Sequence, residues 1–305
     1  MLATAFGTLP VGEGWAYEFK WDGVRALVDV GEHGVRIVSR AGNDVTKGYP
    51  ELVAQASGAG DVLLDGEIVA FDEGRPSFER LQQRMHVRGT AELKQLVQSV
   101  PVTYVVFDVL RRFGVDLTAR PYTERRATLE RFAEDVPGWT LSPAFDDGPA
   151  TLEVARAYGL EGVVAKRVDA PYRPGARSDD WRKLRFEHRG EFAVIGWEAA
   201  PEHPNTLSSV VLGVQRDGRL EYAGRVGSGL SGRAATQLRD RLTEQPAPAV
   251  PGVPPPVRRR RLRWVRPEVV VDVSFTCWTG ERVLRQPVFR GIRTDKTVEE
   301  ATGDG

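Results

Sequence analysis

The stretch from residue 15 to residue 30 limits the possible folds of this chain more than any other. Residues 15–21 alternate in polarity and are rich in aromatic side chains, which is typical of a half-buried β-strand. Asp22-Gly23 follows, a pair that favours a tight turn, and residues 24–30 then alternate again. We therefore expect two consecutive antiparallel strands near the start of the chain, with Lys20 near the end of the first.

The order of strand and helix patterns up to residue 187 favours an α+β fold. Strands are expected at 15–21, 24–30, 34–39, 62–71, 102–110, 161–167 and 181–186, and helices at 78–98, 122–134 and 150–158. Hairpins come early and helices are inserted between later strands, so antiparallel sheets with flanking helices are favoured over a regular βαβ repeat. We expect residues 1–187 to form one domain.

The pattern changes after residue 187. Short strands are expected at 191–199, 208–215, 219–226, 260–265 and 268–276, with one helix at 232–244. Five or so short strands with one helix match a small β-barrel of the OB-fold type, a frequent nucleic-acid-binding platform. We expect residues 188–305 to form this domain, with the Pro-rich residues 245–257 as a loop inside it.

The net charge of zero conceals an asymmetry. Residues 188–305 contain 18 basic and 14 acidic residues, and their steepest positive segment is 258–266. A positive tract with an aromatic residue inside it suits a nucleic-acid backbone, and a solvated strand edge is the alternative. The candidate nucleic-acid contacts of this segment are Arg258, Arg259, Arg260, Arg261 and Arg263.

Other features of the composition exclude several classes of protein. No run approaches the roughly 18 to 20 apolar residues of a membrane span, and no basic start with an apolar core marks a secretory signal. Cys277 is the single cysteine, which fits a reducing cytoplasm. With four scattered histidines there is no zinc-site spacing, so a divalent ion would need carboxylate ligands.

Lysine is scarce in this chain, with 6 lysines against 36 arginines. Where arginine is the usual cation, a retained lysine indicates a role for an amine that can lose its proton and attack an electrophile. Lys-x-Asp-Gly by itself is a common surface turn, so Lys20 needs support from elsewhere. Its surroundings read Glu18-Phe19-Lys20-Trp21-Asp22-Gly23-Val24-Arg25.

Six further segments supply that support by their order along the chain. A carboxylate inside the apolar run 62–71 is costly to bury without a partner, which favours a function for Glu67. Four of the six lysines fall in these segments or at Lys20. The segments are Ser39-Arg40, Asp65-Gly66-Glu67, Phe107-Asp108, Glu161-Gly162-Val163-Val164-Ala165-Lys166, Trp181-Arg182-Lys183-Leu184-Arg185 and Arg293-Thr294-Asp295-Lys296.

In this order the segments resemble the covalent nucleotidyltransferases, and among them the ATP-dependent DNA ligases. The chain is most similar to compact bacterial enzymes related to ligase C and to the ligase domain of ligase D, over residues 13–296. The resemblance implies ATP and Mg²⁺ or Mn²⁺ as cofactors and nicked duplex DNA as substrate. It implies sealing of 3′-OH/5′-phosphate nicks in DNA repair, through a lysyl-AMP and a DNA-adenylate, by a monomer of the bacterial cytoplasm and nucleoid.

The resemblance also assigns roles to residues. It makes Lys20 the nucleophile that holds AMP, with Asp22, Arg25, Lys183, Arg293, Asp295 and Lys296 as further catalytic residues. It implies nucleotide contacts for Glu18, Lys20, Arg25, Arg40, Glu67, Phe107, Glu161, Lys166, Lys183 and Arg185. Glu67 would bind the ribose and Phe107 the adenine, Glu161 and Asp22 would lie near the metal, and Arg40 would also bind nucleic acid.

Several points remain open from the sequence. The fifth segment is commonly Lys-x-Lys in relatives but reads Lys183-Leu184-Arg185 here, which keeps the charge and removes a compact ammonium. The alternatives are an RNA ligase, a GTP-dependent mRNA-capping guanylyltransferase, and a non-catalytic OB-type binder with a structural Lys20. A Ku-like end-binding protein or a repair polymerase is implied as a partner by analogy only. No DNA-clasping, polymerase or phosphoesterase module is expected.

Overall fold

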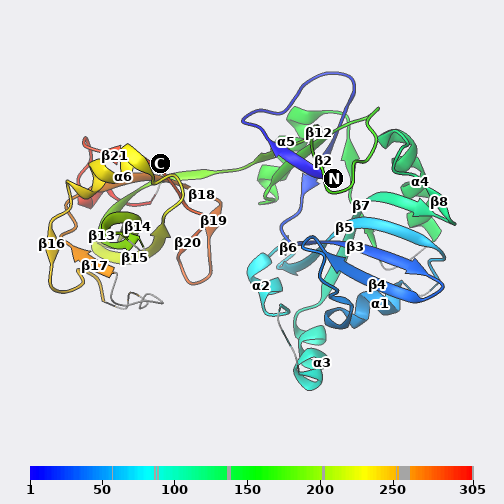
Figure 1. Ribbon diagram of the computed structural model, residues 1–305, viewed down its shortest axis with the longest axis horizontal. Helices are drawn as coiled ribbons and strands as arrows, with labels where there is room; N and C mark the ends of the chain where they lie inside the picture. Colours follow the sequence, from blue (N-terminus) through cyan, green and yellow to red (C-terminus); the bar gives the residue numbers. More distant parts are fainter. Residues whose placement is uncertain are drawn as a thin grey trace. The chain divides into compact units, whose positions relative to one another are not determined.

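The computed structural model describes residues 1–56, 58–85, 87, 89–135, 139–200, 203–251, 253 and 262–303. The chain forms two compact units, Met1–Phe186 and Glu187–Gly305 (Figure 1). Within the described residues, no helix has the length and apolar character needed to cross a membrane.

The described residues of the first unit form two β-sheets. One is built around β11 (Gly162–Arg167) and is called the β11 sheet. β11 pairs antiparallel with β2 (Trp15–Lys20) on one side and with β12 (Arg177–Arg185) on the other. The remaining strands are β1 (Leu2–Ala5) beside β12 and β10 (Ala144–Phe145) beside β2. Helix α5 (Gly148–Ala157) covers one face, where Ala155 joins Tyr17 and Val163 in a small core.

The other sheet of this unit is called the β5 sheet, after its long central strand β5 (Val62–Asp72). β5 lies between β3 (Val24–Gly31) and β7 (Val102–Arg112), and the sheet holds the main core of the unit. The other elements are β4 (Gly34–Ser39), β6 (Arg75–Pro76), β8 (Val115–Asp116), β9 (Thr140–Leu141), η1 (Thr46–Gly48), α1 (Pro50–Gln55), α2 (Phe78–Gln82), α3 (Thr90–Ser99) and α4 (Tyr122–Asp135).

The second unit is a curved β-domain consistent with an OB-fold. Its long strand β13 (His188–Ala200) changes partners along its length, pairing first with β18 (Val270–Phe275) and then with β17 (Leu262–Val265). The buried core includes Phe192 and Trp197. The other elements are β14 (His203–Arg216), β15 (Arg219–Val226), α6 (Gly232–Arg239), β16 (Glu244–Gln245), β19 (Cys277–Trp278), β20 (Leu284–Arg285), β21 (Val288–Arg293) and η3 (Val298–Glu300).

The α+β class and the strands of the first unit are confirmed, with ends shifted by a few residues. Two expected helices differ: 78–98 is interrupted between α2 and α3, and 232–244 ends at Arg239. Helix α1 was not expected, although Pro50 at its first position is a common helix start. Strand β21 was also missed, because its short run contains Gly291.

The turn at Asp22-Gly23 was predicted wrongly as a hairpin. β2 pairs with strands of the β11 sheet, whereas β3 pairs with β4 and β5. The turn therefore carries the chain from one sheet to the other (Figure 1). Gly23 fits this crossing because a Cβ there would lie 2.2 Å from the Ile68 carbonyl oxygen. A local sequence pattern predicts a turn, but not which strand each arm will pair with.

Candidate active site

Lys20 and Glu161 meet at one end of the β11 sheet. Lys20 is the last residue of β2, and its Nζ donates a hydrogen bond to Glu161 Oε2. The other carboxylate oxygen of Glu161 pairs with Arg185 Nε at 2.8 Å. Glu161 is 7% exposed and Lys20 is 17% exposed, so the pair is screened from bulk water but accessible. One carboxylate thus holds two of the predicted nucleotide-binding cations.

Gly162 makes this convergence possible. It is the register partner of both Lys20 and Arg185 on the two neighbouring strands. A Cβ on Gly162 would lie 2.0 Å from the Leu184 carbonyl oxygen, and its φ of +154° disfavours other residues. The close approach of β11 and β12 at this point brings Glu161 to Arg185.

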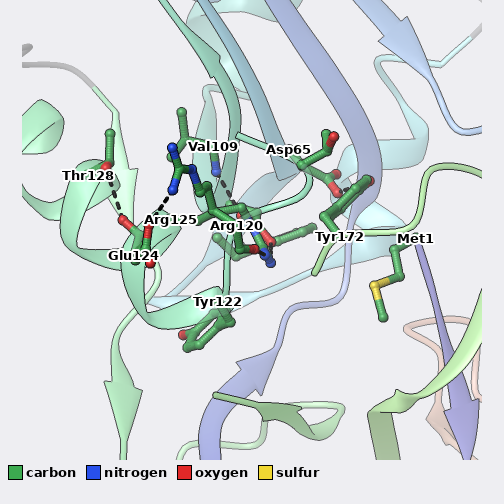
Figure 2. Close-up of polar contacts among 12 residues, drawn as sticks. Met1, Asp65, Val109, Arg120, Tyr122, Glu124, Arg125, Thr128 and Tyr172 are labelled. Carbon is green, nitrogen blue, oxygen red and sulfur yellow. Dashed lines mark hydrogen bonds and ion pairs between the residues drawn. The ribbon is translucent and has the colours of Figure 1, made fainter. Parts of the chain in front are cut away.

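Arg25 is anchored on the β5 sheet by a buried acid. Its Nε donates to Asp65 Oδ1 at 2.9 Å and its Nη2 donates to Asp65 Oδ2 at 2.5 Å. The Tyr172 hydroxyl donates to Asp65 Oδ2 at 2.8 Å, and Figure 2 shows these two side chains facing each other. The guanidinium also lies 5.4 Å from the centre of the Phe107 ring and 5.6 Å from that of Trp181.

Phe107 lies where side chains of the two sheets meet. Its ring packs edge-on against Trp181 of β12, with ring centres 6.1 Å apart. Lys166 Nζ lies 4.7 Å from the centre of the Phe107 ring and donates to the Phe107 carbonyl at 3.1 Å. Phe107 is half-buried, so it is not simply a core residue.

Glu18 and Lys166 form a buried pair beneath this ring. Lys166 Nζ donates to Glu18 Oε1 at 2.6 Å, and the Tyr122 hydroxyl donates to the same oxygen at 2.7 Å. Burial lowers the pKa of Lys166, although the charge of Glu18 acts in the opposite direction. Both residues were predicted to contact the nucleotide, and in this structure both are bound to protein groups.

A second buried ion pair supports the Phe107 strand. Arg125 on α4 forms a bidentate pair with Asp108, at 2.8 and 2.9 Å. The same guanidinium donates to the carbonyls of Arg120 and Ala170, and Figure 2 shows Arg125 and Arg120 close together. Asp108 therefore has a structural role beside Phe107.

Glu67 is a partly buried residue on β5 and is the register partner of Arg25. Burial raises its pKa from 4.5 to about 8, against the opposing charges of Lys20 and Arg25. Among the described residues, none makes a hydrogen bond or ion pair to the Glu67 carboxyl group. A buried polar group without a protein partner is costly, and a ligand that supplies the partner removes that cost.

The remaining predicted residues of the first unit are Lys183, Asp22 and Arg40. Lys183 on β12 faces Val164 on β11, and burial together with the charges of Arg185 and Lys20 lowers its pKa. Asp22 is half-buried in the crossing between β2 and β3. Arg40 follows β4 and is exposed, and its backbone N–H donates to the Arg25 carbonyl at 3.2 Å.

The C-terminal candidates lie in the second unit, at the end of β21. Arg293 donates to Asp295 through two bonds of 2.9 and 2.8 Å, and its Nη1 donates to Glu191 Oε1. These hydrogen bonds lower the pKa of Asp295 to about 2. Lys296 Nζ lies 3.6 Å from Glu300.

Part of the predicted basic tract lies outside the described residues, namely Arg258, Arg259, Arg260 and Arg261. Arg263 is described on β17, where it pairs with Glu244 at 3.2 Å and lies 5.3 Å from the Trp197 ring centre. Among the described residues, no group of three or more His, Cys, Asp and Glu side chains is placed to hold a metal ion.

Comparison with known proteins identifies the family of this chain. Residues 1–185 match the family model of the ATP dependent DNA ligase domain, and residues 203–296 match that of the ATP dependent DNA ligase C terminal region. The chain belongs to the ATP-dependent DNA ligases. The expected family is thereby confirmed, and the RNA ligase, capping-enzyme and non-catalytic alternatives are not favoured.

This ligase is similar to several named relatives. It is 36% identical over 292 residues to the "Multifunctional non-homologous end joining DNA repair protein LigD" of Mycobacterium tuberculosis, covering 94% of this chain and 37% of the relative. A crystal structure of the ligase domain from M. tuberculosis LigD is 35% identical, covers 98% of this chain and 97% of its own, and has a TM-score of 0.54. A mycobacterial DNA ligase D complexed with ATP and MES is 34% identical, covers 99% and 98%, and has a TM-score of 0.55.

The sequence assigned no role to the residues that hold the candidate site of the ligase in place, although it singled out the segment that contains Asp65. Asp65, Tyr172 and Tyr122 bind Arg25 and Glu18, and Glu191 binds Arg293. Asp65 had a visible signal, because it is a second carboxylate in the apolar run around Glu67. The other three make contacts with residues distant in the sequence, which no local pattern predicts.

Proposed function

We propose that this ligase seals 3′-OH/5′-phosphate nicks in duplex DNA and that Lys20 carries AMP between two transfers. The observation that carries the proposal is the convergence of Lys20, Glu161 and Arg185 at Gly162. The charges of Lys20 and Glu161 both act on the Glu67 carboxyl group of the β5 sheet. Sequence similarity to a ligase D complexed with ATP supports ATP as the nucleotide.

The first transfer charges the lysine. The Lys20 ammonium must first lose a proton, and Glu161, its hydrogen-bond acceptor, is the protein group in place to take it. Lys20 Nζ then bonds to the α-phosphorus of ATP while the bond to the bridging oxygen breaks and pyrophosphate leaves. Lys183 and Arg185 supply positive charge for the phosphate oxygens, and an arginine at 185 suffices for this.

The nucleoside part of ATP has matching groups between the two sheets. Phe107 is half-buried and offers a ring face for stacking on the adenine. The Glu67 carboxyl group has no protein partner among the described residues, so a ribose hydroxyl can supply the hydrogen bond it needs. Lys166 binds both Glu18 and the Phe107 carbonyl, so this pair holds β7 in place at the proposed adenine-binding ring.

A divalent cation fits this site. Mg²⁺ is usually held by one or two carboxylates together with substrate phosphates and water, so a larger acidic cluster is not required. Glu161 and Asp22 are the residues that would hold it, and the ion would neutralise phosphate charge when bound.

The second transfer moves AMP to the nick. A 5′-phosphate oxygen attacks the phosphorus of the lysyl-AMP, Lys20 leaves as the amine, and a DNA-adenylate forms. The 3′-OH then attacks the 5′-phosphate and AMP leaves. Arg40 binds the 5′-phosphate of the nick, and Arg25 binds a phosphate group of ATP or of the nick, for which guanidinium groups are well suited. Arg263 and the basic residues 258–261 bind the DNA backbone.

Arg293, Asp295 and Lys296 are part of the proposed charging step, in which the two cations orient the leaving pyrophosphate. We further propose that the ligase acts as a monomer of the cytoplasm in DNA repair, alone or with a Ku-like end-binding protein or a repair polymerase. Similarity to LigD, a DNA repair protein by its name, supports a repair role, and the chain spans 37% of that relative's length.

One experiment tests the core of this proposal. The protein is incubated with labelled ATP or labelled GTP, the protein is denatured, and the mass of the Lys20 peptide is measured. We expect an AMP adduct with ATP only, lost in Lys20→Ala and retained in Lys47→Ala, an exposed lysine of the same unit. Absence of any adduct in the wild type contradicts the proposal, and a GMP adduct indicates a guanylyltransferase. Sealing of nicked RNA in preference to nicked DNA indicates an RNA ligase.

A further inference from the structure

The hydrogen bonds of Arg25 leave one nitrogen for a ligand. Asp65 takes the edge formed by Nε and Nη2, at 2.9 and 2.5 Å. The second N–H of Nη2 points to the Tyr172 hydroxyl at 3.4 Å. Among the described residues, none accepts a hydrogen bond from Nη1 of Arg25. The side chain is 20% exposed, so Nη1 is the nitrogen with protons to offer to a substrate.

The direction of that nitrogen depends on the Asp65 carboxylate. Asp65 is fully buried, and it accepts hydrogen bonds from Arg25 and Tyr172. A buried carboxylate must be satisfied by donors, and Tyr172 is the second donor at Oδ2. Without the hydroxyl, Oδ2 keeps Arg25 alone and Nη2 loses its second acceptor, so the guanidinium is free to turn about its ion pair.

Tyr172 is itself held firmly. It is 6% exposed, and its ring packs edge-on against Trp181 with ring centres 5.7 Å apart. The Arg125 guanidinium lies 5.8 Å from the centre of the same ring. The Tyr172 ring is therefore held by Trp181 and Arg125 as well as by its hydroxyl, as expected of a group that orients another.

We propose that Tyr172 is a positioning residue which, through Asp65, holds Arg25 with Nη1 directed at a phosphate group of the substrate. The inference rests on the proposed function and adds to it a residue that touches no substrate. The phosphate belongs either to ATP or to the 5′ end at the nick. The two sources are distinguished by measuring the two transfers separately.

The test uses Tyr172→Phe, which removes the hydroxyl and keeps the ring. One arm measures single-turnover formation of the AMP adduct against ATP concentration. The other measures sealing of a pre-adenylated nick, and transfer of AMP to an ordinary nick, against DNA concentration. We expect the rate to fall on the order of tenfold to a hundredfold in the reaction whose phosphate group Arg25 binds. This is the effect of losing one hydrogen bond to a charged group. The other arm should stay within about twofold of wild type.

Two controls separate positioning from loss of stability. Tyr104→Phe removes another buried hydroxyl, one on β7 that donates to the carbonyls of Ala26 and Leu64. It should leave both transfers close to wild type at an equal or greater loss of thermal stability. In an Arg25→Ala background, Tyr172→Phe should cause no further loss, because its effect acts through Arg25.

Three results would overturn the inference: unchanged rates in both arms, equal losses in Tyr104→Phe and Tyr172→Phe, or the same loss from Tyr172→Phe with and without Arg25. A wild-type protein that forms no AMP adduct would instead contradict the proposed function. The two failures are thus distinguished by the wild-type reaction.

Discussion

Lys20 and Glu161 form an ion pair although 141 residues separate them in the sequence. The strands that carry them are direct neighbours, and Glu161 stands just before the first residue of β11. Because its second oxygen binds Arg185, Glu161 fixes the spacing of two cations with one carboxylate. Glu161 thus holds the proposed nucleophile, Lys20, near the proposed phosphate-binding residue Arg185.

Replacing Glu161 by Gln should slow formation of the AMP adduct by at least about tenfold, or ~1.4 kcal/mol of activation free energy. The amide keeps the shape of the side chain but cannot accept the Lys20 proton. Single-turnover labelling with ATP measures the rate. Glu153→Gln, at an exposed position on α5, is the control and should behave as wild type. A normal rate in Glu161→Gln would remove this residue from the mechanism.

Gly162→Ala should disrupt the same site through the backbone. The added Cβ would overlap the Leu184 carbonyl, so β11 and β12 must separate where Glu161 reaches Arg185. We expect a loss of about 2–4 kcal/mol in the free energy of unfolding, measured in urea, and a marked loss of adduct formation. Gly48→Ala, where a Cβ meets no atom within 4 Å, should change neither by much. Equal behaviour of the two variants would show that the close approach is unimportant.

Glu67 should make stability fall as the pH rises. Its pKa is about 8 in the native state against 4.5 ordinarily, so the native state binds the extra proton between these values. The contribution is fully present below pH 4.5 and is lost as the pH rises through about 8. Urea unfolding without nucleotide at pH 5, 7 and 9 should show Glu67→Gln gaining stability relative to wild type with increasing pH. Parallel curves for the two proteins would refute this.

Arg293→Ala and Lys296→Ala should slow charging of Lys20 more than sealing of a pre-adenylated nick. Point variants are better than truncation, because residues 291–303 form part of the β-domain: Ala301 is fully buried and the Gly303 N–H donates to the Glu191 carbonyl. We expect at least about a tenfold difference between the two effects. Arg282→Ala, at an exposed position of the same unit, serves as the control. Equal losses in both steps would contradict the assigned role.

The sequence predicted the strands of the first unit because their side chains alternate and their ends carry turn residues. It also predicted the residues that lie together at the β11 sheet, through their order and the scarcity of lysine. It did not predict the crossing at Asp22-Gly23, because the choice of partner strand depends on packing that is remote in the sequence.

The positions of the residues that support the site could not be predicted from the sequence either. Tyr172 follows an irregular segment before β12, and nothing local connects it with Asp65, 107 residues earlier. Glu67 is a different case, since a carboxylate in an apolar run already indicated a group that needs a partner. In the structure, burial raises the pKa of Glu67, and no group among the described residues hydrogen-bonds to its carboxyl group.

The crossing between the two sheets has a consequence for how the site tolerates change in length. Lys20 ends a strand of one sheet and Arg25 lies in a strand of the other, with Gly23 pressed against Ile68 between them. The segment therefore acts as a spacer of fixed length between nucleophile and phosphate-binding group. Adding or removing one residue would move Lys20 or Arg25 away from its present partners. The length of this segment therefore sets the distance between the nucleophile and the phosphate-binding group, and with it the substrate that the site can accept.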